Sequence, residues 1–230
     1  MRTRREFLMG SGLATAAWLT QGTLLAQAAG QNPGAAPNAA TAQTPATAVS
    51  TNPAVQPNPD LAQQLRTAAQ TEKIKTTKLT DTIFLLQGVG GNVVCQLGPD
   101  GKLVIDSQIS TGTPQLLDAL GKLDEHKLKL LINTHWHFDH TDGNAALHLA
   151  GAFIVAHENT RSRLLKPQTM VTYAAQFPAA PDAGLPQETF AESQALWVNN
   201  DHLELVHTPE AHTDSDVFIH FSRGNVIHTG

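Results

Sequence analysis

The stretch NTHWHFDHTDGN, residues 133–144, places three histidines and one aspartate within six consecutive positions: His135, His137, Asp139 and His140. Imidazole nitrogens and carboxylate oxygens are ligands for zinc, and they also bind iron and manganese. Residues two apart in an extended chain point the same way, so His135 and His137 can approach one cation from a strand end. We expect a turn after His137 that offers Asp139 and His140 to a second cation.

A second histidine-containing segment offers the ligand that the first cation still lacks. In HTPEAHTDSD, residues 207–216, Pro209 excludes a regular central strand, so His212 is expected on a loop. We assign His212 as the third ligand and place His207 at a strand end near the site. Three protein ligands plus a water form the open arrangement of catalytic zinc, which lowers the pKa of its water to about 7. The pattern therefore predicts a catalytic centre that supplies hydroxide at neutral pH.

Structural roles are expected for the residues around these ligands. Trp136 and Phe138 alternate with the histidines, so they should pack beneath the loop. Asp214 and Asp216 are interpreted as turn residues or as hydrogen-bond partners of the ligands. The remaining histidines are interpreted as surface residues or as satisfied core residues: His126, His148, His157, His202, His220 and His228.

Strand and helix patterns alternate along the part of the chain that must position these residues. A helix is predicted to begin after Pro59, and short strands joined by tight turns are predicted from residue 73 to residue 107. A helix over Thr113–Leu123 precedes the apolar strand KLKLLINTH, which runs directly into the first histidine segment. Residues 166–187 contain four prolines and little periodicity, and are predicted as a long loop.

The same alternation continues toward the end of the chain. Helices are predicted at residues 144–150 and 157–165, with a strand at 152–156 between them. A second group of strands is predicted at Ala195–Val198, Leu203–His207, Asp216–Phe221 and Asn225–His228. This order favours sheets covered by helices over a helical bundle.

The composition limits the partners that the chain can have. Its 230 residues carry a formal net charge of −5, and a nucleic-acid partner, which needs a basic face, is not expected. Cys95 is the only cysteine, which excludes an intrachain disulfide and a thiolate metal cluster. The sequence does not indicate an oligomeric state.

Residues 1–28 have the three-part layout of an export signal: paired arginines, an uncharged and moderately apolar stretch, and the small-residue sequence AQA. The pair Arg4–Arg5, followed by Phe7 and Leu8, resembles a twin-arginine signal, which is read by the twin-arginine export machinery. The uncharged stretch is too polar to form a stable transmembrane helix, which needs about 20 predominantly apolar residues. We therefore expect cleavage near Ala28, a periplasmic protein and no stable membrane span after cleavage.

A linker separates this signal from the folded region. No charged residue occurs from Gly30 to Pro59, where Ala, Pro, Asn and Thr dominate. Such a segment cannot bury enough apolar surface to offset its ordering entropy. The predicted organisation is a signal at 1–28, a disordered linker at 29–59 and one domain at 60–230.

THWHFDHTDGN looks like the H-x-H-x-D-H motif of the metallo-β-lactamase superfamily, and HTPEAHT resembles the next metal-binding segment of that family. The resemblance covers roughly residues 73–230. It implies an α/β (α+β) fold, the αββα sandwich, in which two sheets lie face to face, helices lie outside and a metal pair sits at one edge. His135, His137 and His212 would hold the first metal. Asp139 and His140 would contribute to the second, and Asp139 would also orient the nucleophile and accept its proton.

The segment NVIHTG resembles the strand that precedes the bridging aspartate of that family. In most members the aspartate follows HTG directly and a further histidine comes later, whereas this sequence ends at Gly230. We therefore expect a fold that is incomplete at its C-terminus, in a sequence that is a fragment.

These observations predict an exported zinc-dependent hydrolase, with two zinc ions in the complete protein, that acts on a small-molecule ester, thioester, lactone or lactam. Two alternatives stay open. One is a mononuclear-iron enzyme of the same fold that oxidises a sulfur substrate, and the other is a catalytically incomplete metal-binding fragment. The motif is specific to the superfamily but not to any one activity within it.

Overall fold

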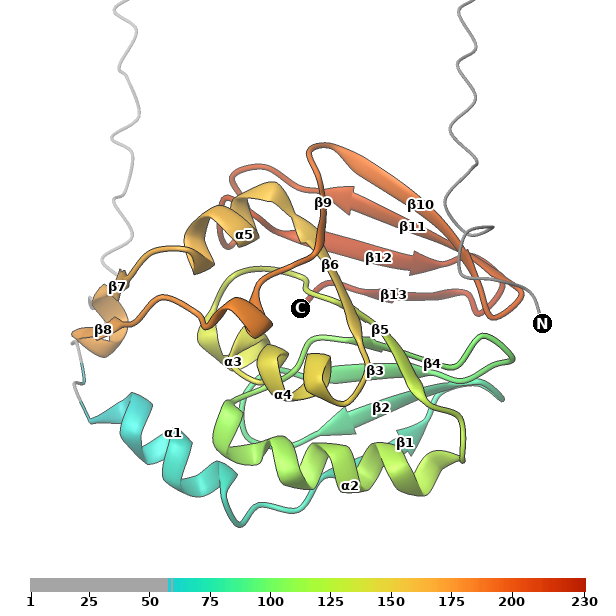
Figure 1. Cartoon of the computed structure of the whole chain (residues 1–230), viewed down its shortest axis with the longest axis horizontal. Coiled ribbons are helices and arrows are strands. Elements are labelled where there is room, and N and C mark those ends of the chain that lie inside the picture. Colours follow the sequence, from blue (N-terminus) through green and yellow to red (C-terminus); the bar gives the residue numbers. More distant parts are fainter. Residues whose placement is uncertain (1–57, 59) are drawn as a thin grey trace, which may run out of the picture. The chain divides into compact units, whose positions relative to one another are not determined.

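Two β-sheets lie face to face, with helices against the outer face of the first sheet (Figure 1). This computed structural model describes residues 58 and 60–230, which belong to one folded unit. The predicted signal at 1–28, and the linker at 29–59 apart from Asn58, lie outside the described residues.

The first sheet has seven strands in the order β1-β2-β3-β4-β5-β6-β9. They are β1 (Lys75–Lys78), β2 (Ile83–Gln87), β3 (Val93–Gln96), β4 (Lys102–Ile105), β5 (Leu128–Ile132), β6 (Phe153–His157) and β9 (Glu188–Phe190). Strands β1 to β4 form an antiparallel meander, and β5, β6 and β9 continue the sheet in parallel with β4. The carboxyl ends of β4, β5 and β6 therefore meet at one edge, where ligands of open α/β sheets bind.

The second sheet is an antiparallel meander in the order β10-β11-β12-β13. Its strands are β10 (Ser193–Val198), β11 (Asp201–His207), β12 (Val217–Phe221) and β13 (Val226–His228). The helices are α1 (Leu61–Ala69), α2 (Thr113–Leu123), α3 (Phe138–Thr141), α4 (Asn144–Leu149) and α5 (Glu158–Leu164), with 3₁₀ turns η1 (Ser110–Gly112), η2 (Val171–Tyr173) and η3 (Asp182–Gly184).

Strands β3 and β4, in the middle of the first sheet, are buried on both faces. Successive side chains of a strand point to opposite faces. Val93, Cys95 and Val104 pack toward α2 and α4. Val94, Leu103 and Ile105 pack toward the second sheet. Residues 93–95 and 103–105 are therefore apolar on both faces, and the polar residues of these strands, Gln96 and Lys102, lie at strand ends and are also buried.

The second sheet is buried on its inner face alone. Leu205 and Ile219 are fully buried between the sheets, whereas Trp197 and Ile227 on the outer face are 79% and 62% exposed. None of the described helices packs across this outer face. The described residues thus contain three of the four layers of the predicted αββα sandwich.

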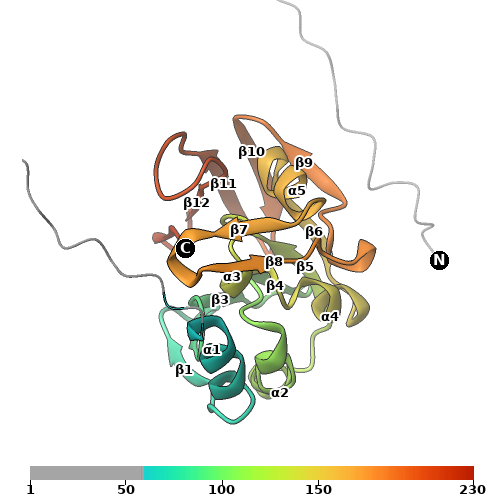
Figure 2. The same cartoon turned by 90° about the vertical axis from the view of Figure 1, so that its left-hand side faces the viewer.

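The prediction for residues 166–187 was wrong in part. The segment contains a small hairpin, β7 (Gln168–Met170) paired with β8 (Ala175–Phe177), and it ends in η3. Figure 2 shows this hairpin alongside α3. Strands of three residues are too short to show an alternation of apolar and polar side chains. The prolines therefore led to the prediction of a loop. The strand β9 was also not predicted, for the same reason.

The predicted helix after Pro59, the helix at Thr113–Leu123 and the strand ahead of the histidine segment are confirmed as α1, α2 and β5. Among the described helices, none is both long enough and apolar enough to cross a membrane.

Candidate metal centre

The first ligand loop, residues 133–141, leaves the end of strand β5 and includes the one-turn helix α3. His137 is extended (φ −60°, ψ 147°) and directly precedes α3. The turn expected after His137 is therefore present. Because of this turn, the side chains of Asp139 and His140 do not continue the direction of the His135 and His137 side chains.

A buried carboxylate, Asp106, holds this loop from below. Its oxygens accept hydrogen bonds from the backbone N–H of Thr134 (2.8 Å) and from the Thr134 hydroxyl (2.7 Å). They also lie 2.8 Å from Nδ1 of His140. Asp106 is 0% exposed and has a left-handed φ of 65°, a conformation that aspartate adopts more readily than most residues.

The sequence interpretation missed Asp106. It follows β4, and β4 is parallel to β5, so the two strands bring Asp106 and the first ligand loop to the same sheet edge. The available signal was a charged residue directly after the apolar run LVI. Its meaning depends on which strand pairs with β4, which the sequence does not show.

A reciprocal amide pair fixes the base of the first ligand loop. The Asn133 and Asn144 side chains donate to each other's carbonyl oxygens at 3.0 and 2.8 Å. The Ser107 hydroxyl donates to Oδ1 of Asn144 at 2.8 Å. All three residues are buried, so these bonds tie the carboxyl ends of β4 and β5 to the start of α4.

The second ligand loop, residues 208–216, joins β11 to β12 and carries His212 at its exposed tip. The Asp216 carboxylate accepts hydrogen bonds from the backbone N–H groups of His212 and Thr213 and from the Thr213 hydroxyl. At the base, the Val217 N–H donates to the Thr134 carbonyl at 2.8 Å, which joins the second loop to the first. The prediction that Asp216 supports this turn is confirmed.

Three of the predicted ligands come together. One ring nitrogen from each of His135, His137 and His212 lies within 4.8 Å of the others, and Nε2 of His212 is 2.9 Å from Nδ1 of His137. Nε2 of His135 is buried without a hydrogen-bond partner. Among the described residues this is the single group of three or more such side chains with metal-ligand spacing.

The protonation states suit cation binding. Burial lowers the pKa of His135 to about 3, helped by the positive charge of His140. Burial and the neighbouring His212 lower the pKa of His137 to about 4. Both imidazoles are therefore neutral near pH 7, with ring lone pairs available to a metal ion.

Asp139 and His140 form a separate pair beside the three histidines. Nε2 of His140 lies 3.6 Å from the Asp139 carboxylate. Burial would lower the pKa of His140, but the charge of Asp106 and its hydrogen bond raise it. Burial would likewise raise the pKa of Asp106, but His140 and then His228 hold it well below its usual range. Because Asp106 engages Nδ1, Nε2 is the nitrogen of His140 left to face Asp139.

A glycine allows the chain to approach His140 closely. A Cβ atom at Gly91 would lie 2.2 Å from the His140 ring, and the Gly91 N–H donates to the Asp139 carbonyl at 3.0 Å. The loop between β2 and β3 therefore packs directly on α3 because position 91 has no side chain.

Two of the residues given structural roles behave as predicted. Phe138 is buried and stacks on Phe177, with ring centroids 4.6 Å apart. His207 ends β11 and stacks on His157 at 3.7 Å, outside the three-histidine group. The interpretation of His228 as a surface or satisfied core residue did not include a contact with the site. His228 is buried, and its Nε2 lies 3.7 Å from the Asp106 carboxylate, because β13 ends beside β12 at the site edge.

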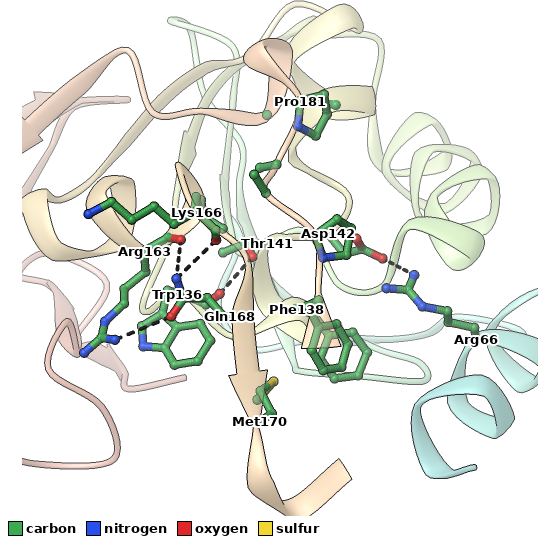
Figure 3. A pocket seen from close by; sticks show the side chains of 17 residues that line it. Arg66, Trp136, Phe138, Thr141, Asp142, Arg163, Lys166, Gln168, Met170 and Pro181 are labelled. Carbon is green, nitrogen blue, oxygen red and sulfur yellow. Dashed lines mark hydrogen bonds and ion pairs between the residues drawn. The ribbon is translucent and has the colours of Figure 1, made fainter. Parts of the chain in front are cut away.

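Two cavities lie near the ligand loops. The larger, of about 650 Å³, is lined by His135, His140, His212 and Asp216 together with residues of β12 and β13. Its volume is within the usual range of small-molecule sites. The smaller, of about 120 Å³, lies against Trp136 and Phe138 and is shown in Figure 3. The larger cavity therefore opens onto the histidines themselves.

Residues 87–230 match the sequence profile of the metallo-beta-lactamase superfamily. No curated protein matches the chain significantly. Several solved structures share the fold. A metallo-beta-lactamase of Cronobacter sakazakii, described by a HARLDQ motif, superposes with a TM-score of 0.62 at 16% identity, covering 77% of this chain and 66% of that one.

The subclass B3 metallo-beta-lactamase BJP-1 of Bradyrhizobium japonicum superposes with a TM-score of 0.56 at 23% identity, covering 67% of this chain and 59% of that one. A metallo-beta-lactamase from Pontibacter korlensis gives 0.55 at 20% identity, covering 66% and 68%. The chain thus spans between 59% and 68% of the lengths of these three proteins.

Proposed function

Because this chain belongs to the metallo-beta-lactamase superfamily, we propose that it is an exported zinc-dependent hydrolase of a small-molecule ester, thioester, lactone or lactam. The observation that carries the proposal is the convergence of His135, His137 and His212 at the edge of a cavity of about 650 Å³. Three imidazoles with one open side are the ligand set of catalytic zinc.

The residues fit a zinc ion in three respects. The buried Nε2 of His135 lacks a hydrogen-bond partner within the described structure, which is costly unless a ligand satisfies it. The low pKa values of His135 and His137 remove proton competition near pH 7. The donor set contains imidazoles and no thiolate, which suits zinc and also iron.

When bound, zinc would act as a Lewis acid and supply hydroxide near neutral pH. Asp139 is 27% exposed, so its carboxylate can orient a nucleophile and accept its proton. Asp106 fixes the orientation of His140, and Asp139 and His140 would contribute to a second metal position. The larger cavity would hold the substrate against His135 and His212.

The test is hydrolysis by the metal-stripped and zinc-loaded chain. The probes are p-nitrophenyl acetate, acetylthiocholine, δ-valerolactone and nitrocefin, one for each substrate class. We expect turnover of at least one probe, loss of turnover with a chelator and recovery with added zinc. His212→Ala should fold but should not recover. Zinc-loaded protein that hydrolyses none of the probes, or hydrolysis that survives chelation, would contradict the proposal.

Metal analysis separates zinc hydrolysis from the iron alternative. Zinc in the purified protein supports hydrolysis. One iron per chain, with oxygen consumption on a sulfur substrate, would favour the oxidative enzyme of the same fold.

Export to the periplasm is a separate part of the proposal, supported by the twin-arginine pattern at Arg4–Arg5. Replacing both arginines by lysine should retain the protein in the cytoplasm with the signal uncleaved. Cell fractionation that finds this variant processed and periplasmic would contradict export by the twin-arginine machinery.

A further inference from the structure

Arg163, on α5, contacts both ligand loops from outside the metal centre. Helix α5 follows β6 and lies beside the carboxyl end of the first sheet. Neither ligand loop includes α5, and none of the predicted ligands lies on it. Its side chains nevertheless reach both loops.

The contact with the second ligand loop is a forked ion pair. Nε of Arg163 donates to the two carboxylate oxygens of Asp214 at 3.3 and 3.1 Å, and Nη2 donates to Oδ2 at 2.7 Å. Two donors on one planar guanidinium fix the orientation of the carboxylate as well as its distance. Asp214 is two residues from His212, so this contact restrains the chain that carries the third ligand.

The contact with the first ligand loop is through an aromatic ring. The Arg163 guanidinium carbon lies 5.7 Å from the Trp136 ring centroid, within the range of a cation–π interaction. The Trp136 ring in turn meets the His137 ring edge to face, with centroids 4.4 Å apart. Figure 3 shows Arg163 beside Trp136 at the rim of the smaller cavity, with Gln168 bonded to the same guanidinium.

Other contacts hold Asp214 in place for this interaction. Its backbone carbonyl accepts hydrogen bonds from Nδ2 of Asn159 at 2.7 Å and from Nε2 of His207 at 3.2 Å. His207 also stacks on His157, the residue directly before α5. The helix and the second ligand loop are therefore aligned by the backbone of Asp214, and Arg163 adds the link to Trp136.

We propose that Arg163 is a positioning residue for the metal centre: it ties Asp214 to Trp136 and so sets the separation of His212 from His137. The inference rests on the proposed function, because it assigns a role toward a metal held by these histidines. The side chains of Arg163 and Asp214 are 44% and 43% exposed. Exposed ion pairs contribute little to global stability, so the effect of Arg163 is on metal geometry and affinity.

The test uses Co²⁺ as a spectroscopic replacement for zinc, because zinc itself has a filled d shell and no such absorption. Arg163→Gln should change the visible Co²⁺ spectrum and weaken Zn²⁺ affinity about tenfold, the scale expected for an outer partner of a metal ligand. Its thermal unfolding without metal should match that of the unchanged chain. Arg163→Lys keeps the positive charge but loses the planar pair of donors to Asp214. Its Co²⁺ spectrum and Zn²⁺ affinity should therefore lie between those of the unchanged chain and those of Arg163→Gln.

Lys166→Gln is the matched control, because it removes a positive charge from the same cavity rim without touching Asp214 or Trp136 through any described contact. Asp214→Asn should reproduce the Arg163→Gln spectrum, and the double variant should be no worse than either single one. The inference is overturned if Arg163→Gln leaves the spectrum and affinity unchanged, or if Lys166→Gln alters them equally. A chain that binds neither Co²⁺ nor Zn²⁺ before any substitution overturns the proposed function as well.

Discussion

The two ligand loops reach the same site by different physical means. The first continues a buried strand, and Thr134 and His135 are 0% and 3% exposed. The second has an exposed tip. There the His212 N–H donates to the Asp216 carboxylate, and the neighbouring Asp214 is bonded to α5 by Arg163 and Asn159. The first loop is therefore ordered by the same contacts that stabilise the fold, whereas the second can be disturbed while the fold remains.

This difference has an energetic consequence. Removing one partner of a buried ion pair destabilises a protein by about 3–5 kcal/mol, whereas an exposed pair contributes about 0.2–1 kcal/mol. Substitutions beneath the first loop should therefore impair folding and metal binding together. Substitutions in the second loop should impair metal binding with little change in the unfolding free energy.

The largest effect is expected for Asp106→Ala, which leaves Thr134 and His140 without their buried partner. The unfolding free energy of the metal-free protein should fall by about 3–5 kcal/mol, measured by urea denaturation. Asp201→Ala is the matched control, because Asp201 is also buried but bonds Gln96 and Arg223 away from the histidines. Asp201→Ala should lower the unfolding free energy and leave the zinc affinity unchanged. A stability change below about 1 kcal/mol for Asp106→Ala would contradict this account of the first loop.

His212→Ala should separate binding from folding. We expect zinc affinity, measured by chelator competition, to fall more than the roughly 10–100-fold typical of an outer partner, because a ligand is lost. The unfolding free energy without metal should change by less than about 0.5 kcal/mol, because the site is exposed. His220→Ala, on the outer face of the second sheet, should change neither. A His212→Ala protein that is severely destabilised would show that the second loop is part of the folding unit.

Acid should destabilise the metal-free protein through the first loop. The pKa values of His135 and His137 are about 3 and about 4 when folded, against about 6.5 when unfolded. Between pH 6.5 and pH 4 the unfolded chain binds more protons, so the unfolding free energy should fall, by an amount on the order of 2 kcal/mol after solvent screening. His140 acts in the opposite direction: its pKa is raised, so its contribution is full below pH 6.5 and is lost as pH rises through its folded pKa.

The measurement is urea denaturation between pH 4 and pH 8 with chelator present, for the unchanged chain and for His137→Gln. The variant should show a shallower decline on the acid side. Equal slopes for the two proteins would indicate that other groups cause the acid sensitivity.

The smallest effect is expected for Asp216→Asn, which weakens the acceptor for the His212 and Thr213 N–H groups without removing it. Zinc affinity should fall by about tenfold, with a change in unfolding free energy of at most about 1 kcal/mol. Thr213→Val removes a single donor to the same carboxylate and should have a smaller effect on affinity. Calorimetric zinc titration would measure both. A zinc affinity for Asp216→Asn equal to that of the unchanged chain would show that Asp216 does not position His212 for metal binding.

The sequence predicted local features well and long-range ones poorly. The histidines of the first loop were found because they lie within six positions of one another. Helix α2 was found from its helical apolar spacing, and β5 was found as a short apolar run. The assignment of a second metal position to Asp139 and His140 stays a prediction. The structure places the two side by side but outside the three-histidine group.

What the sequence did not predict depends on pairing between distant segments. Asp106 reaches the first loop because β4 and β5 are parallel, and His228 reaches Asp106 because β13 pairs with β12. Arg163 meets Trp136 and Asp214 through the placement of a helix, which no local pattern encodes. In each case the residue types were visible, but their neighbours were not.

A crystal structure of the zinc-soaked protein, with anomalous diffraction recorded at the zinc absorption edge, would locate the bound metal directly. We expect an anomalous peak about 2.0–2.1 Å from one ring nitrogen each of His135, His137 and His212. Zinc bound elsewhere on the chain, with these three histidines free of metal, would contradict this expectation.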